Sequence, residues 1–96
     1  MKKIILDIRK YTKPDQIHEY IAQKMDFPQY YGKNLDALYD MLTDIREETC
    51  IALILGEESG KDAFIRGFIR VFNEAEYEKD NLAVLICNLG KDGFLS

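Results

Sequence analysis

Three short runs of apolar residues divide the chain and predict its β-strands. They cover Ile4–Ile8 (IILDI), Thr49–Leu55 (TCIALIL) and Leu82–Cys87 (LAVLIC). Each run is rich in β-branched residues and lacks the strict alternation of apolar and polar positions that a half-exposed strand shows. The pattern therefore predicts strands that are covered on both faces, or on much of both, as in a parallel sheet.

The first helical pattern lies between the first two strands, with Ile17, Tyr20, Ile21 and Met25 at helical spacing. The spacing from Thr12 to Asp15 resembles a capping box, and Pro14 is tolerated in a first helical turn. The helix should end before the Phe27-Pro28 pair, because a residue that precedes proline avoids the α region.

Two further helices are predicted downstream. One opens at Asn34, a favoured N-cap residue, and runs to about Asp44. The other begins after Ser59, whose spacing to Asp62 again resembles a capping box, and runs to about Lys79. Its apolar stripe comprises Phe64, Ile65, Phe68, Val71, Phe72 and Ala75. The order β-α-α-β-α-β favours an α/β fold with a three-stranded parallel sheet covered by helices.

Composition excludes several classes of protein. With 47% hydrophobic and 31% charged residues, the 96-residue chain does not have the composition of a disordered or low-complexity protein. Its apolar runs of five to seven residues are far shorter than the roughly 20 needed to span a bilayer, so we expect no membrane partner. A net charge of −4 argues against direct binding to nucleic acid. Two cysteines outside any CxxC motif fit a reduced cytoplasmic protein.

The second predicted helix has two chemically distinct faces. Its apolar stripe comprises Leu35, Leu38, Leu42 and Ile45, and the opposite face carries Asp36, Asp40 and Asp44, with Thr43 beside them and Tyr39 on the border. Like charges at i,i+4 spacing each cost a helix roughly 0.2–0.5 kcal/mol, and no basic residue on this face offsets them. Residues 26–48 contain six acidic and two basic residues, whereas the rest of the chain is neutral. The face is either simply solvated or a surface for a cationic partner, with Tyr30, Tyr31 and Tyr39 as aromatic anchors.

The residues from Phe27 to Thr43 (FPQYYGKNLDALYDMLT) resemble the signature of the barstar family, small cytoplasmic proteins that inhibit barnase-type ribonucleases. A second match is Val71–Ala75 (VFNEA) in the last helix, and the resemblance spans residues 2 to about 87. The resemblance implies the barstar fold, a small parallel sheet covered by three to four helices; a shorter connection before the last helix favours three. We expect one domain over residues 1–96, with 88–96 as a C-terminal extension of no assigned role.

The resemblance also implies a partner-binding surface. The helix opening at Asn34, with the loop before it, would plug the nuclease active site. Asp40 would be the principal anion, placed where the substrate phosphate binds, and Asp36 a secondary ion-pair partner. Tyr30 would stack on the active-site face of the enzyme.

The remaining expected contacts lie at the edge of this surface. Thr43 would donate or accept a hydrogen bond, Tyr39 occupies a position that is usually tryptophan, and Glu74 matches a peripheral acidic contact. Asp44 and Ile45 stand where well-known members have a glycine and a large aromatic residue. We include Asp44 in the expected surface, but this departure leaves the identity of the target enzyme open.

Catalytic and ligand-binding interpretations have weaker support. The segment from Gly56 to Asp62 resembles a P-loop, but its glycines are one residue too close and Asp62 stands where Ser or Thr must bind magnesium. Three aspartates on one straight helix face rarely provide a complete cation site. A nucleophilic pair of Cys50 with His18 has no third group to support it, and His18 is better explained as a surface or half-buried structural residue.

The sequence therefore predicts a non-enzymatic inhibitor or immunity protein without a cofactor or metal. It would act as a monomer in a 1:1 complex with a small, basic, extracellular-type ribonuclease, with its acidic helix mimicking RNA phosphates. The alternative is an interaction module of the same fold that neutralises a different cationic partner, for instance a DNase-type toxin. A small-ligand or cation-binding enzyme is the third class considered.

Overall fold

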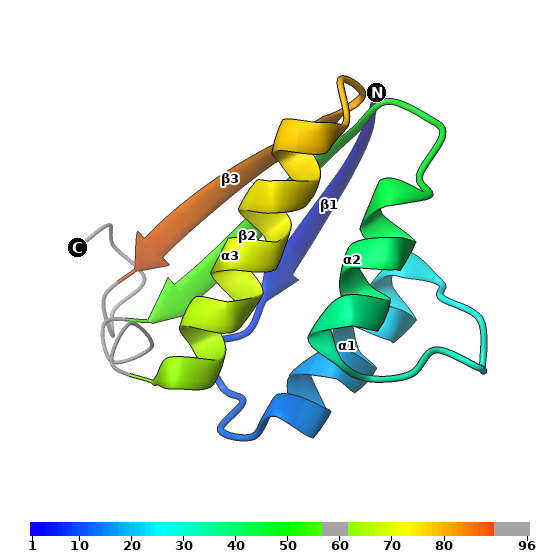
Figure 1. Cartoon of the computed structure of the whole chain (residues 1–96). Helices are drawn as coiled ribbons and strands as arrows, with labels where there is room; N and C mark the ends of the chain where they lie inside the picture. Colours follow the sequence, from blue (N-terminus) through cyan, green and yellow to red (C-terminus); the bar gives the residue numbers. More distant parts are fainter. Residues whose placement is uncertain (57–61, 90–96) are drawn as a thin grey trace.

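A computed structural model describes residues 1–56 and 62–89 of the chain (Figure 1). The chain order confirms the predicted alternation of strands and helices. The described elements are β1 (Lys2–Asp7), α1 (Pro14–Met25), α2 (Leu35–Thr43), β2 (Thr49–Gly56), α3 (Ala63–Glu78) and β3 (Leu82–Leu89). The fold is α/β, with a three-stranded parallel sheet and three helices in the described part of the chain. None of these helices is long and apolar enough to cross a membrane.

The three strands lie in the order β1-β2-β3, so β2 is the central strand. Both pairings are parallel, and the register places Ile4 beside Ile51 and Ile51 beside Val84. The next inward row consists of Leu6, Leu53 and Ile86. This register gathers apolar residues of all three strands into one face beneath the helices.

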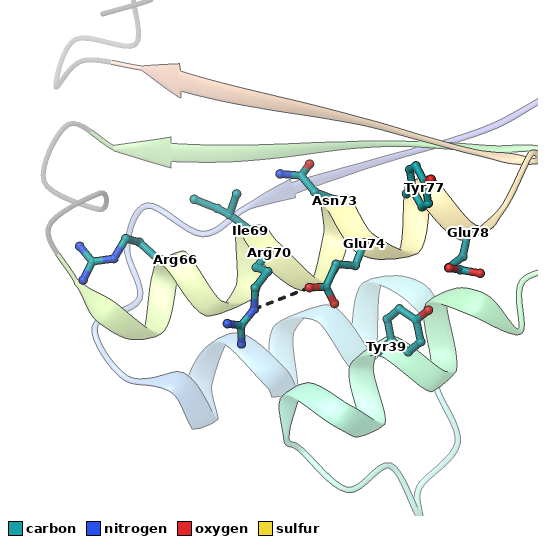
Figure 2. A pocket seen from close by; sticks show the side chains of 8 residues that line it. All are labelled: Tyr39, Arg66, Ile69, Arg70, Asn73, Glu74, Tyr77 and Glu78. Atoms are coloured by element: carbon teal, nitrogen blue, oxygen red, sulfur yellow. Dashed lines mark ion pairs between the residues drawn. The ribbon is translucent and has the colours of Figure 1, made fainter.

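The described helices all lie on one face of the sheet, which corrects the expectation that both faces, or much of both, are covered (Figure 2). Along β2, buried residues alternate with partly exposed ones from Thr49 to Gly56. The outward row of Ile5, Ala52 and Leu85 includes two large side chains that are 58% and 56% exposed, Ile5 and Leu85. The apolar runs lacked alternation because the open face is also built from apolar residues, so hydrophobicity alone did not distinguish the two faces.

The core lies between the inward face of the sheet and the helices. Phe68 and Phe72 of α3 are its largest fully buried side chains, and Leu38 and Leu42 of α2 are also fully buried. Helix α2 packs against α3 at a small residue, since a Cβ added to Gly67 would lie 2.9 Å from Cδ1 of Leu35. The missing side chain at Gly67 thus lets the first turn of α2 approach α3 closely.

Two predicted helix starts differ from the structure. The N-cap of α1 is Lys13, without a side-chain cap, and the Gln16 side chain instead accepts a hydrogen bond from the Thr12 backbone N–H at 3.3 Å. Helix α3 begins at Ala63, later than expected, and its N-cap Asp62 makes no side-chain capping bond. Ser59 lies outside the described residues, so the capping box predicted there remains a prediction.

Candidate functional site: the exposed face of α2

The start of α2 is fixed by Asn34, as the sequence predicted. The Asn34 backbone is extended, with φ −140° and ψ 170°, and its side-chain oxygen accepts a hydrogen bond from the Ala37 backbone N–H at 2.8 Å. Its amide nitrogen donates to the Gly32 carbonyl at 3.3 Å. Asn34 therefore ties the preceding loop to the first turn of α2, which orients both parts of the expected surface.

The two faces of α2 are separated as predicted. Leu38 and Leu42 are completely buried, whereas Asp36, Asp40 and Asp44 are exposed. Among the described residues, none of these three aspartates forms an ion pair. The helix thus presents carboxylates to solvent on a backbone that the opposite face anchors in the core.

The basic residue nearest the start of α2 is directed elsewhere. Lys33 has a left-handed backbone, with φ 54°, and its ammonium nitrogen lies 3.0 Å from a carboxylate oxygen of Glu19 on α1. Both side chains are largely exposed, so the pair adds little to stability. It does direct the Lys33 charge toward α1, so that charge does not pair with the aspartates of α2.

The adjacent tyrosines Tyr30 and Tyr31 have opposite environments. Tyr30 is 81% exposed, whereas Tyr31 is 6% exposed and belongs to the core. The Tyr31 hydroxyl forms a 2.6 Å hydrogen bond with Nδ1 of His18, and its ring lies 5.0 Å from that of Phe27. The buried ring holds the loop against α1 and leaves Tyr30 available to a partner. Of the three tyrosines suggested as anchors, Tyr31 is a core residue.

Thr43 lies at the end of the acidic face and uses its hydroxyl hydrogen within the helix. Its Oγ1 donates to the Tyr39 carbonyl at 2.8 Å, and it lies 3.3 Å from the Asp40 carbonyl. The hydroxyl oxygen can still accept a hydrogen bond, because a hydroxyl has two acceptor lone pairs. Of the two roles expected for Thr43, the acceptor role is therefore the one compatible with this geometry.

Tyr39 and Glu74 meet at a groove between α2 and α3 with a volume of about 650 Å³ (Figure 2). Burial raises the pKa of the Tyr39 hydroxyl, and the carboxylates of Glu78, Glu74 and Asp40 raise it further. Acidic side chains of both α2 and α3 therefore lie near this hydroxyl. Sequence reasoning did not identify most of the groove, although the i,i+4 spacing along α3 was a usable signal. The missed lining residues are Arg66, Ile69, Arg70, Asn73, Tyr77 and Glu78.

The structure does not bring Cys50 and His18 together as a nucleophilic pair. His18 is only 3% exposed, in contact with Tyr31 and Phe68, which corrects its expected placement at or near the surface. Burial lowers the His18 pKa, which favours the neutral imidazole. Cys50 is paired with Lys3 and Ala83 in an outward row of the sheet, on the face away from the helices. His18 is therefore a structural core residue.

The described residues do not support the other two alternatives, a metal site and a P-loop. In the described part of the chain, no group of three or more His, Cys, Asp or Glu side chains is arranged to hold a metal ion. The segment that resembled a P-loop falls largely on residues 57–61, outside the described residues. What remains is an exposed acidic helix face, preceded in the chain by the exposed Tyr30 and adjoining the groove through Tyr39.

Comparison with known proteins agrees with this arrangement. The family model described as Barstar (barnase inhibitor) matches residues 1–87. The chain belongs to the barstar family. As a barstar-family inhibitor it is a non-enzymatic protein, which confirms the prediction that it is not an enzyme.

A relative in Bacillus subtilis (strain 168), named "Putative ribonuclease inhibitor YrdF", is 35% identical to the chain over 91 residues. The match covers 90% of this barstar-family chain and 99% of the relative. The family match over residues 1–87 includes α2 and the loop before it.

Proposed function

We propose that this chain inhibits a small, basic, barnase-type ribonuclease by covering its active site with the exposed face of α2. One observation carries the proposal: Asp36, Asp40 and Asp44 are exposed and without ion pairs among the described residues, on a helix whose opposite face buries Leu38 and Leu42 in the core. The family membership and the name of the Bacillus subtilis relative support a ribonuclease as the target.

The mechanism needs no chemistry from the inhibitor. An enzyme that cleaves RNA must present cationic groups where the phosphate binds, and carboxylates on a rigid helix satisfy those groups as the substrate does. Because α2 is already folded, capped by Asn34 and anchored by Leu38 and Leu42, binding orders little additional structure. Tyr30 adds an exposed aromatic side chain in the loop before the acidic helix, and aromatic residues are enriched at the centres of interfaces.

We further propose that the protein acts in the cytoplasm as a monomer, in a 1:1 complex. Cys50 and Cys87 are both free thiols, which fits a reducing compartment. An inhibitor kept inside the cell would protect the RNA of a cell that makes a secreted nuclease.

Competition with substrate tests this proposal. We expect the chain to inhibit RNA cleavage by at least one member of a panel of barnase-type ribonucleases, with an apparent inhibition constant that rises linearly with RNA concentration. A stoichiometry of one, measured by calorimetry, would support the 1:1 complex. Inhibition that is independent of substrate concentration would contradict occlusion of the active site. Binding to a basic DNase-type toxin, with no ribonuclease bound, would favour the alternative partner.

A further inference from the structure

The groove between α2 and α3 has an apolar wall that the proposed function leaves unused. Tyr39 lines it from α2, and Ile69, Asn73 and Tyr77 follow one another along α3 at four-residue spacing (Figure 2). Tyr77 is 89% exposed, more than any other large hydrophobic side chain in the part of the chain that the structure describes. Among the described residues, its hydroxyl has no hydrogen-bond partner. The fold thus gains little from Tyr77, whereas an exposed tyrosine beside an apolar hollow is typical of an interface.

A second row of α3 side chains borders this wall, and its charge changes from positive to negative along the helix. Arg66, Arg70, Glu74 and Glu78 recur at four-residue spacing, so they lie on one side of the helix. The acidic half lies next to α2, because Glu74 and Glu78 line the groove together with Tyr39 of that helix. The basic half carries the opposite charge.

Arg70 is the informative residue of the basic half. Its guanidinium lies 3.9 Å from the Glu74 carboxylate, and both side chains are more than half exposed, so the ion pair is weak. A uniformly basic nuclease surface placed over the groove would be repelled by Arg70. A surface whose basic patch ends in an acidic side chain would match the change of sign along α3.

We propose that this groove is a second, selectivity-determining part of the nuclease interface. It takes an apolar side chain of the nuclease between Tyr39, Ile69 and Tyr77, and an acidic side chain of the same nuclease segment at Arg70. The inference rests on the proposed function, because the groove is continuous with the acidic face through Tyr39 and Glu74. A ribonuclease with a basic side chain opposite Arg70 would bind more weakly, even if its active site pairs equally well with the aspartates of α2.

Reversing the charge of Arg70 tests the inference by the sign of the effect. Arg70→Glu makes the chain more acidic, so long-range attraction alone would strengthen its binding to a basic ribonuclease. A lost local contact would weaken it instead. The matched control is Lys24→Glu, an equal change of charge at an exposed position on α1, outside the groove.

The affinities are measured against the ribonuclease that the wild-type chain inhibits most tightly in a panel of barnase-type enzymes. We expect Arg70→Glu to weaken binding at least about tenfold and Tyr77→Ala at least about fivefold, effects that only a minority of interface residues reach when they are substituted. Lys24→Glu should leave binding unchanged or make it slightly tighter. Melting curves establish that each variant is folded, and amide hydrogen exchange should show protection along residues 69–77 in the wild-type complex.

The failures of the two proposals are distinguishable. If Arg70→Glu binds as tightly as Lys24→Glu, Tyr77→Ala binds normally and residues 69–77 gain no protection, the groove lies outside the interface. Asp40→Asn would then still weaken inhibition, and the proposed function would stand. If no ribonuclease in the panel is inhibited by the wild-type chain, the proposed function fails and this inference fails with it.

Discussion

The Tyr31 hydroxyl lies 2.6 Å from Nδ1 of His18 in the interior of the protein, and this bond joins the loop before α2 to α1. The adjacent residue, Tyr30, is exposed. A buried, neutral pair of side chains thus fixes the position of a loop whose outer surface is expected to meet the partner. The stability of the core and the geometry of the binding surface are therefore linked through two consecutive tyrosines.

This linkage predicts a loss of stability on mild acidification. Burial lowers the His18 pKa in the folded state; the Lys33 charge lowers it further, whereas the Asp15 charge opposes the shift. His18 therefore binds a proton more readily in the unfolded chain than in the folded protein. The stability falls as the pH drops below the pKa of an unfolded histidine, about 6.5. We expect the unfolding free energy from urea titrations to be level above about pH 7. It should decline below about pH 6.5, by at most about 1.4 kcal/mol per pH unit for this one group.

The acid-induced loss can be assigned to His18 by its pH range. Asp7, whose pKa is lowered mainly by its hydrogen bond with Arg9, contributes stability that is lost only near and below the ordinary carboxyl range. An unfolding free energy that stays constant from pH 7.5 to 5.5 would contradict the role given to His18.

The two tyrosines should respond to substitution in opposite ways. Tyr30→Ala removes an exposed ring, so stability should change by less than about 0.5 kcal/mol, while inhibition weakens by roughly 2 kcal/mol or more. Tyr31→Ala leaves a cavity and an unpaired His18, and should destabilise the fold by about 3 kcal/mol or more. Thermal melts and inhibition assays on both variants check this. A Tyr30→Ala variant that unfolds, beside a stable Tyr31→Ala variant, would reverse the assignment.

Because the described helices cover one face of the sheet, two leucines on neighbouring strands should differ greatly in their contribution to stability. Leu53 points into the core and is fully buried, whereas Leu85 lies on the open face and is 56% exposed. Leu53→Ala should cost about 2–5 kcal/mol of stability and Leu85→Ala less than about 1 kcal/mol. Chemical denaturation of both variants measures the difference, and equal losses would mean that the open face is covered in solution.

The acidic face should also make association sensitive to salt. Attraction between exposed carboxylates and a basic nuclease is screened as the Debye length falls toward about 8 Å at physiological ionic strength. In stopped-flow experiments, the association rate constant should drop markedly from low to physiological salt, while the dissociation rate constant changes much less. An association rate that does not vary with salt would argue against electrostatic steering.

Much of the fold could be predicted because local chemistry agrees with the tertiary structure. Asn34 is a strong N-cap residue, α1 ends at Met25, before the Phe27-Pro28 pair, and Leu38 and Leu42 repeat at helical spacing. The open face of the sheet could not be predicted, because Ile5, Leu85 and the inward residues are all apolar. Coverage depends on where the helices pack, and hydrophobicity does not encode that choice.

The candidate site was predictable in part for a similar reason. The aspartates of α2 form a single-helix pattern, which the sequence displays directly. The groove is a contact between two helices, so its wall appears only once Leu35 has packed against Gly67 and brought Tyr39 beside α3. His18 was misplaced because its neighbours in the core, Tyr31 and Phe68, are distant in sequence.

Asp40 provides the test that separates a functional residue from a structural one. It lies between Asp36 and Asp44 at four-residue spacing, so its removal should relieve roughly 0.4–1 kcal/mol of repulsion, and alanine favours the helix. Asp40→Ala should therefore raise the melting temperature by a few degrees. In the complex, its loss would leave cationic groups of the nuclease buried and unpaired, which typically costs about 2–5 kcal/mol. The barnase–barstar complex is itself a standard example of strong coupling between charges, so the expected loss of about 2–5 kcal/mol is a value already known for this family.

The dissociation constant of Asp40→Ala for an inhibited barnase-type ribonuclease is the most direct measurement of the central claim. Asp15→Ala, which removes an exposed carboxylate from the first turn of α1, is the matched control. We expect Asp40→Ala to bind at least about thirtyfold more weakly than the wild-type chain and Asp15→Ala to bind within about twofold of it. An Asp40→Ala variant that binds as tightly as wild type would show that α2 does not present its carboxylates to the active site.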